Sequence, residues 1–132
     1  MRVVLDTNVI IAAFATRGLC TEVFNICVES HTMVISEQIL SEIQEKLAAK
    51  VRLPQNTIDE IIEYLGKITE SVEPVNIEKS ACRDADDLKV IGTAVSGKAE
   101  FIITGDEDIL VLKKYGQVEM ISPREFWNRL RK

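Results

Sequence analysis

The chain has 132 residues, 46% of them hydrophobic and 28% charged, which suffices for one domain with a buried core. Acidic residues outnumber basic ones by 21 to 16, and the net charge of −5 argues against indiscriminate coating of nucleic acid. This balance does not exclude nucleic acid as a substrate, so the positions of the acidic residues become the question. No run of 18 apolar residues is present, so no transmembrane helix is expected.

The cysteine and histidine content predicts a reduced, cytoplasmic protein. Cys20, Cys27 and Cys82 are an odd, scattered set without zinc-ligand spacing, and His31 is the single histidine. Unpaired thiols of this kind are typical of proteins in a reducing compartment.

Expected strands and helices alternate along the chain. The first half is expected to contain a strand at 2–5, an apolar stretch to 14, a helix from 21 to about 29, a strand at 32–35 and a helix with an apolar stripe to 51. A helix from 57 to 68 follows, then a weak strand or connector at 75–77 and a helix from the acids at 84–87 to the glycine at 97. The last part is expected to contain a strand at 101–104, a short helix at 109–112, a strand at 118–121 and a C-terminal helix from 123. The strands lack a polar face, which is typical of parallel strands covered on both sides. The sequence therefore predicts one domain over residues 1–132, a three-layer α/β/α fold with a mostly parallel central sheet.

Residues that cap helices mark several of the expected helix starts. Thr21 and Ser36 are candidate N-caps, and residues 57–60 and 122–125 have the pattern of capping boxes. Pro123 stands at the first helical position of the last helix, where its missing N–H costs nothing.

Several acidic residues fall where the expected strands end. Asp6 follows the first strand, Asp106 follows the strand at 101–104, and Glu42 lies on the helix after the second strand. The helix that precedes the strand at 101–104 opens with three acids, Asp84, Asp86 and Asp87. A capping or first-turn role is the alternative for Asp84 and Asp86. Ligands of open α/β sheets bind beyond the carboxyl ends of the strands. If the first strand and the strand at 101–104 are neighbours, Asp6 and Asp106 meet at one edge.

Gathered carboxylates favour a divalent cation. Two carboxylates about 4 Å apart repel by about 4 kcal/mol at an effective dielectric near 20. A site that collects several of them needs a cation or a raised pKa. All-oxygen ligands suit Mg²⁺ or Mn²⁺ rather than zinc, and such ions can activate water and stabilise the leaving oxygen of a phosphodiester.

Two other classes fit these acidic positions less well. A phosphohydrolase with an aspartyl nucleophile would need Asp-x-Asp after the first strand, but position 8 is Asn. A phospho-receiver domain would need a lysine after the last strand, where Ser122 and Pro123 stand instead.

Four segments resemble the PIN domain in order and spacing, over essentially the whole chain. They are LDTNV (residues 5–9), Glu42 after the second strand, RDADD (residues 83–87) and ITGDEDIL (residues 103–110). The chain is most similar to the small, stand-alone prokaryotic branch that includes the VapC-type toxin ribonucleases. The resemblance implies a Mg²⁺- or Mn²⁺-dependent endoribonuclease that hydrolyses RNA.

The resemblance also implies roles for particular residues. The acidic quartet of the family matches Asp6, Glu42, Asp87 and Asp106, of which Asp6, Asp87 and Asp106 are the expected metal ligands. Secondary roles fall to the following residues: Asn8, expected to orient Asp6; Thr104, before the Gly-Asp pair; Asp108, expected to hold a metal-bound water; and Asp84, the alternative to Asp87 as ligand.

The expected partners follow from the same resemblance. They are an RNA substrate, a small antitoxin protein, and a second copy of the chain in a homodimer or higher homo-oligomer, with no membrane association. Candidate RNA-contacting residues are Arg17, Lys46, Lys50, Arg52 and Lys113. The alternative function is a catalytically inactive PIN-like module that only binds RNA or protein.

Overall fold

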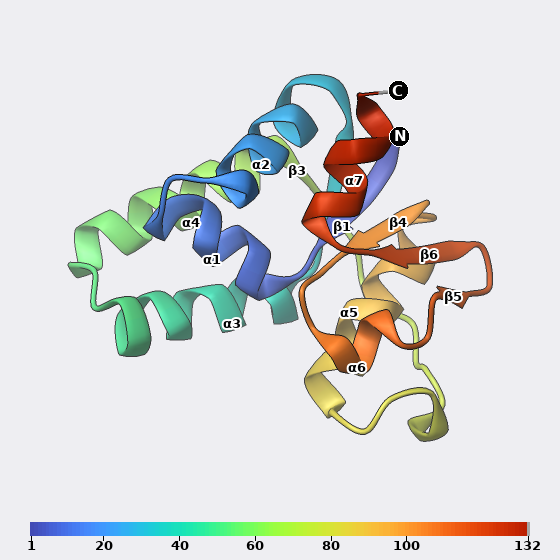
Figure 1. Cartoon of the computed structure of the whole chain (residues 1–132). Helices are drawn as coiled ribbons and strands as arrows, with labels where there is room; N and C mark the ends of the chain where they lie inside the picture. Colours follow the sequence, from blue (N-terminus) through green and yellow to red (C-terminus); the bar gives the residue numbers. More distant parts are fainter. Residues whose placement is uncertain (132) are drawn as a thin grey trace.

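The computed structural model describes residues 1–131, which form a six-stranded sheet and seven α-helices (Figure 1). The strands are β1 (Arg2–Leu5), β2 (Thr32–Ile35), β3 (Thr69–Ser71), β4 (Phe101–Ile103), β5 (Lys114–Tyr115) and β6 (Val118–Ile121). The helices are α1 (Thr7–Ala15), α2 (Leu19–Ser30), α3 (Glu37–Lys46), α4 (Gln55–Ile68), α5 (Ala85–Ser96), α6 (Glu107–Leu110) and α7 (Pro123–Leu130). Two short turns of other helix types, at Leu47–Val51 and Lys79–Ala81, complete the set.

The strand order of the sheet is β3-β2-β1-β4-β6-β5. Every neighbouring pair is parallel except β5 and β6. The pairing of β1 with β4, in which Leu5 lies opposite Ile103, fulfils the condition for Asp6 and Asp106 to meet. The predicted mostly parallel sheet is confirmed, with one antiparallel edge strand that the sequence pattern did not indicate.

Helices cover both faces of the sheet, so the predicted three-layer arrangement is confirmed. Figure 1 shows α5 and α6 on one side of β1, β4 and β6, with α2 and α7 on the other. Contacts agree with this view, because α5 packs on β1, β2 and β4 while α2 packs on α7 and β2. Fully buried residues from both layers and from the sheet, including Ile91, Ile102 and Phe126, belong to one core.

Several predicted helix starts are confirmed and two are wrong. Ser36 and Ser122 cap α3 and α7 through the backbone N–H groups of Ile39 and Glu125. By contrast, α2 begins at Leu19 and α4 at Gln55, each two residues before the predicted cap. The hydroxyl of Thr21 donates to the carbonyl oxygens of Ala13 and Thr16 instead, so it joins α2 to the preceding helix.

The structure decides between the two interpretations of residues 75–77 in favour of a connector. The edge strand is β3, which continues directly from α4 and pairs with β2. Its sequence is Thr-Glu-Ser and its side chains are largely exposed, so no apolar run marks it. Val75 instead donates its backbone N–H to the Gly92 carbonyl oxygen at 3.2 Å, against α5.

No single helix among residues 1–131 has the length and apolar composition to cross a membrane. Only α1 and α2 taken together meet this criterion of length and composition, and a bend of 106° separates the two helices.

Two helical glycines give opposite predictions for substitution by alanine. A Cβ on Gly92 would collide with the Val75 carbonyl oxygen, whereas a Cβ on Gly66 in α4 would meet nothing within 4 Å. We expect Gly92→Ala to destabilise the fold by about 1–3 kcal/mol because the backbone of the connector must move. Gly66→Ala should stabilise it by about 0.5–1 kcal/mol because alanine is the better helix former. Urea unfolding of both variants measures the difference, and equal effects would contradict this packing.

Candidate active site

The carboxyl ends of β1 and β4 place Asp6 and Asp106 at one edge of the sheet. Asp6 is the N-cap of α1, and its backbone N–H donates to the Ile103 carbonyl oxygen at 2.9 Å. Asp106 is the N-cap of α6, two residues after the fully buried Thr104. Both aspartates therefore begin helices at the end where an open α/β sheet binds its ligands.

The Thr104 hydroxyl links the two aspartates. It donates a hydrogen bond to Asp6 Oδ2 at 2.7 Å and accepts one from the backbone N–H of Asp106 at 3.0 Å. The Thr7 backbone N–H donates to the other oxygen, Asp6 Oδ1, at 2.8 Å. Asp6 is thus buried and held at both oxygens, and Thr104 sets its position relative to Asp106.

Asp106 also belongs to a cluster of three aspartates. Asp87, Asp106 and Asp108 each offer a carboxylate oxygen, and these oxygens all lie within 4.8 Å of one another. Asp106 Oδ1 accepts the backbone N–H of Asp108 at 2.9 Å, which fixes the turn between them. Asp108 also pairs with the exposed Arg83 at 2.9 Å. The cluster combines the first turn of α5 with the N-cap and first turn of α6.

The charge on Asp87 is destabilised in this position. Burial raises the pKa of Asp87 to about 7, with further contributions from the negative charges of Asp106, Asp84 and Asp6. Within residues 1–131, no lysine or arginine forms an ion pair with Asp6, Asp87 or Asp106. A divalent cation that prefers oxygen ligands would relieve this repulsion, so the donor set fits Mg²⁺ or Mn²⁺.

Asp6 experiences opposing influences. Burial raises its pKa, and the charge of Asp106 raises it further. The hydrogen bonds from Thr104 and Thr7 and the charge of Lys46 act in the opposite direction. The net effect is a raised pKa, so Asp6 shares the electrostatic cost of the cluster although it lies outside the tightest group of oxygens.

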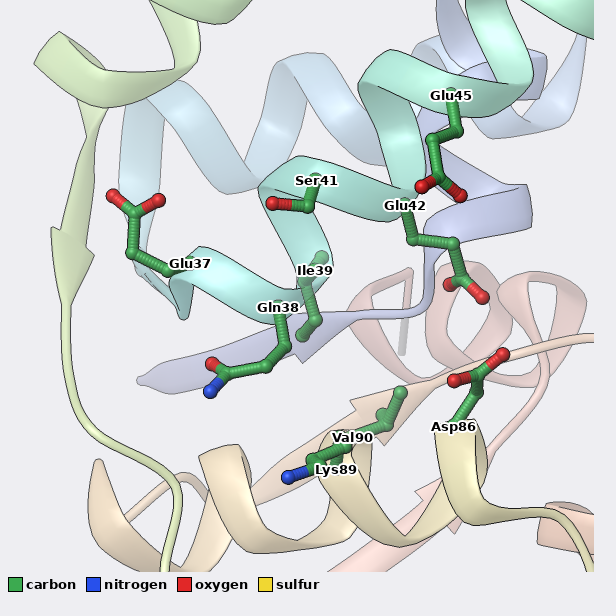
Figure 2. Close-up of a pocket in the computed structure, with 9 residues that line it drawn as sticks. All are labelled: Glu37, Gln38, Ile39, Ser41, Glu42, Glu45, Asp86, Lys89 and Val90. Atoms are coloured by element: carbon green, nitrogen blue, oxygen red, sulfur yellow. The ribbon is translucent and has the colours of Figure 1, made fainter.

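Glu42 lines a cleft of about 450 Å³ between α3 and α5, whose α5 side includes Asp86, the residue directly before Asp87. Figure 2 shows its carboxylate pointing toward that of Asp86 across the cleft. Other acidic and polar residues line the same space, namely Glu37, Gln38, Ser41, Glu45 and Lys89. The structure therefore places Glu42 on the α3 side of this cleft, across from the first turn of α5.

The Asn8 side chain has a different neighbour from the one expected. Its carbonyl oxygen accepts a hydrogen bond from Lys46 Nζ at 3.2 Å, and the same nitrogen lies 3.9 Å from Glu42 Oε2. The orienting contacts of Asp6 come from Thr7 and Thr104 instead. Asn8 is thus connected to Glu42 through Lys46 rather than to Asp6.

The geometry favours Asp87 over Asp84 as a ligand. Asp84 is exposed and its carboxylate caps α5 by accepting the backbone N–H of Asp86 at 2.8 Å. Asp87 is only 7% exposed and faces Asp106 and Asp108. One carboxylate oxygen of Asp84 is therefore engaged in capping α5, whereas the carboxylate of Asp87 is directed into the cluster.

Sequence reasoning missed Cys82 at the site. The buried Cys82 thiol lies 3.6 Å from Asp87 Oδ2 and 3.7 Å from the Asp108 carbonyl oxygen, and it can donate to either. Its position directly before the RDADD segment is the one signal in the sequence, but a lone cysteine there has no distinctive spacing.

Thr104→Val tests the link between Asp6 and Asp106. The change keeps the shape but removes a hydrogen bond to a carboxylate, so we expect a loss of about 1.5–3 kcal/mol in stability. Thr93→Val is the matched control, because Thr93 is equally buried and bonds to Ser36 and Lys89 away from the cluster. Both variants should melt earlier, but only Thr104→Val should also reduce the stabilisation by Mg²⁺ in thermal melts. An unchanged Mg²⁺ increment in Thr104→Val would contradict this role.

Solved structures share the fold at low sequence identity. VapBC2 from Rickettsia felis, solved bound to a DNA fragment from its promoter, is 15% identical, with a TM-score of 0.64 over 92% of this chain and 98% of that one. VapBC-1 from nontypeable Haemophilus influenzae is 17% identical, with a TM-score of 0.65 over 94% and 99% of the two chains. FitAcB from Neisseria gonorrhoeae is also 17% identical, with a TM-score of 0.59 over 92% and 98%.

The sequence comparisons define the family. No curated protein matches the chain by sequence. A sequence model of the PIN domain matches residues 2–108, from β1 through the cluster residue Asp108. The chain therefore belongs to the PIN domain family.

Proposed function

We propose that the protein is an endoribonuclease that depends on Mg²⁺ or Mn²⁺ and hydrolyses RNA phosphodiester bonds. The observation that carries this proposal is the cluster of Asp87, Asp106 and Asp108, with oxygens within 4.8 Å of one another, joined to Asp6 through Thr104. Membership of the PIN domain family supports a nuclease, and the carboxylate cluster supports hydrolysis that is assisted by a bound metal ion.

Each acidic residue has a proposed part. Asp6, Asp87 and Asp106 hold the divalent cation, and Asp108 holds it directly or through water. The cation, when bound, supplies positive charge to the phosphate and makes bound water more acidic. Glu42, on α3, completes the set of acidic residues around the cation or helps to deprotonate the attacking water.

The expected products are a 5′-phosphate and a 3′-hydroxyl. The water oxygen adds to phosphorus, the bond from phosphorus to the 3′ oxygen breaks, and that oxygen takes up a proton. The alternative route through the 2′-hydroxyl usually uses a paired acid and base, such as histidines. His31 lies at the other end of the sheet, where it contacts the Met1 amino group at 3.1 Å, so it does not reach the cluster.

Cleavage of RNA in the presence and absence of metal tests the proposal. We expect Mg²⁺ or Mn²⁺ to support cleavage of a generic single-stranded RNA, and excess EDTA to abolish it. Mapping the ends should give 5′-phosphates, because water is the proposed nucleophile. Cleavage that survives in excess chelator would refute the metal mechanism, and 2′,3′-cyclic phosphate ends would refute the water route.

An inactive RNA- or protein-binding module is the second candidate. It is favoured by the two basic residues that already pair with acids of the site, Lys46 with Glu42 and Arg83 with Asp108. Binding of RNA without cleavage at any Mg²⁺ or Mn²⁺ concentration would support this module and refute the nuclease.

The biological role that we propose is that of a VapC-type toxin with a small antitoxin partner. Two of the similar structures are VapBC proteins, which supports this role. Expression in bacteria should arrest growth, and co-expression with the small antitoxin that we propose should relieve the arrest. We also propose a cytoplasmic homodimer or higher homo-oligomer, which light scattering of the purified protein would detect as a mass of at least twice 14.8 kDa.

A further inference from the structure

Lys46 has a placement that no other described lysine shares. It lies in the last turn of α3 and its side chain is only 25% exposed, whereas every other lysine between residues 1 and 131 is exposed. Burial of a lysine is costly unless its ammonium has partners. In this protein the partners are the Asn8 carbonyl oxygen at 3.2 Å and Glu42 Oε2 at 3.9 Å.

These partners belong to the site rather than to the surface of α3. Asn8 is part of the segment that carries Asp6, and Glu42 is an acid of the proposed quartet. The charge of Lys46 also reaches Asp6, whose pKa it lowers, while Asp106 acts on Asp6 in the opposite sense. The acidic edge therefore has a half-buried lysine on its α3 side, whereas the cluster of Asp87, Asp106 and Asp108 has only the exposed Arg83, on Asp108, as a basic partner among residues 1–131.

We propose that Lys46 supplies the second positive charge of the active site by contacting the scissile phosphate, so that the chain needs one divalent ion rather than two. This inference rests on the proposed nuclease function and deepens it. The divalent ion would be held by Asp6, Asp87 and Asp106, with Asp108 holding it directly or through water. Glu42 and Asn8 would hold the ammonium in place of a second ion.

The chemistry of the neighbouring groups supports a site with one divalent ion and one lysine ammonium. Two-metal phosphodiesterases place positive charge on both the attacking and the leaving side of phosphorus. A lysine ammonium is a compact charge with three donors, which can contact a phosphate oxygen while it keeps protein acceptors. The oxygens of Glu42 and Asn8 are the kinds of ligand that a second Mg²⁺ would use. An ammonium that already contacts them repels a second cation.

Counting bound Mn²⁺ in three variants tests the inference without RNA. Lys46→Met removes the charge and keeps the length of the side chain, and Lys46→Arg keeps the charge. Lys67→Met is the control, since Lys67 is an exposed lysine that pairs with Glu63 one turn earlier in α4, as Lys46 pairs with Glu42 in α3. We expect calorimetry and electron paramagnetic resonance to find one Mn²⁺ per chain in the wild type, Lys46→Arg and Lys67→Met. Lys46→Met should bind a second Mn²⁺, because Glu42 and Asn8 become free to ligate it.

Kinetics with a short RNA in Mg²⁺ then separate a role in the transition state from general RNA binding. We expect Lys46→Met to lower kcat by about 10- to 100-fold with KM nearly unchanged, as for loss of a group that stabilises developing charge. Lys46→Arg should restore most of kcat, and Lys67→Met should leave kcat unchanged. Circular dichroism confirms that each variant is folded.

The possible outcomes decide separately on Lys46 and on the nuclease. Two Mn²⁺ ions in the wild type, or a single ion in folded Lys46→Met, would overturn the inference. A loss confined to KM would also overturn it, because Lys46 would then only bind RNA. If the wild type cleaves no RNA, the proposed function fails, while the Mn²⁺ counts still decide whether Lys46 occupies the place of a second ion.

Discussion

Asp87→Asn should strongly reduce cleavage and the response to metal while the metal-free protein becomes more stable. Asp87 is buried and repelled by Asp106, Asp84 and Asp6, so removal of its charge relieves a cost at pH 8. We expect the metal-free variant to gain about 1–2 kcal/mol in unfolding free energy, after allowance for solvent screening of the cluster. Loss of one ligand from the cluster should lower kcat by about 10²-fold or more. Melting curves in EDTA and in Mg²⁺, together with RNA cleavage, measure these effects.

Asp84→Asn is the matched control for this variant. Asp84 is exposed and caps α5, and asparagine is about as good an N-cap as aspartate. We expect its stability to change little and its Mg²⁺ increment and cleavage to stay close to those of the wild type. If Asp84→Asn loses the Mg²⁺ response and Asp87→Asn keeps it, Asp84 rather than Asp87 is the ligand.

The metal-free protein should become more stable as the pH falls from 8 to 5.5. The pKa of Asp87 is about 7 in the folded protein and lies near 3.8 without the fold, so the native state binds more protons between these values. Unfolding free energy therefore rises as the pH decreases through 7, by up to about 2 kcal/mol at pH 5.5. Asp6, whose pKa is also raised, acts in the same direction. Urea unfolding in EDTA at the two pH values measures the change.

Other titrating groups and the metal provide internal checks of this pH dependence. The pKa of His31 is lowered, first by burial, so His31 opposes the trend below about pH 6.5, and His31→Gln removes that contribution. Glu70 and Glu119 have lowered pKa values and lose stabilisation only below the range measured. The part of the slope that comes from Asp87 should be lost in Asp87→Asn and in saturating Mg²⁺, so the slope should become much shallower. A slope that persists unchanged in Asp87→Asn would show that another group causes it.

The sequence by itself determined the layers of the fold and the placement of most of its elements. The apolar runs at 2–5, 32–35 and 118–121 coincide with β1, β2 and β6, because buried parallel strands need residues that are apolar on both faces. The serines before α3 and α7 determine where those helices start, because capping is a local interaction between near neighbours. Elements without such local signals were missed, namely the polar edge strand β3 and the two-residue β5.

The sequence also indicated which carboxylates meet. The acids that follow β1 and β4 had to converge if these strands paired, and Leu5 lies opposite Ile103. The sequence could not decide which acids form the tight cluster or which residues the charge of Lys46 contacts. Asp87, Asp106 and Asp108 approach one another because α5 and α6 begin side by side, and Asn8 meets Lys46 because α1 packs on α3. These contacts join residues far apart in the chain, and the last of them spans 38 positions. They depend on packing between helices. The angles and distances at which helices cross follow from the whole core rather than from any local run of residues.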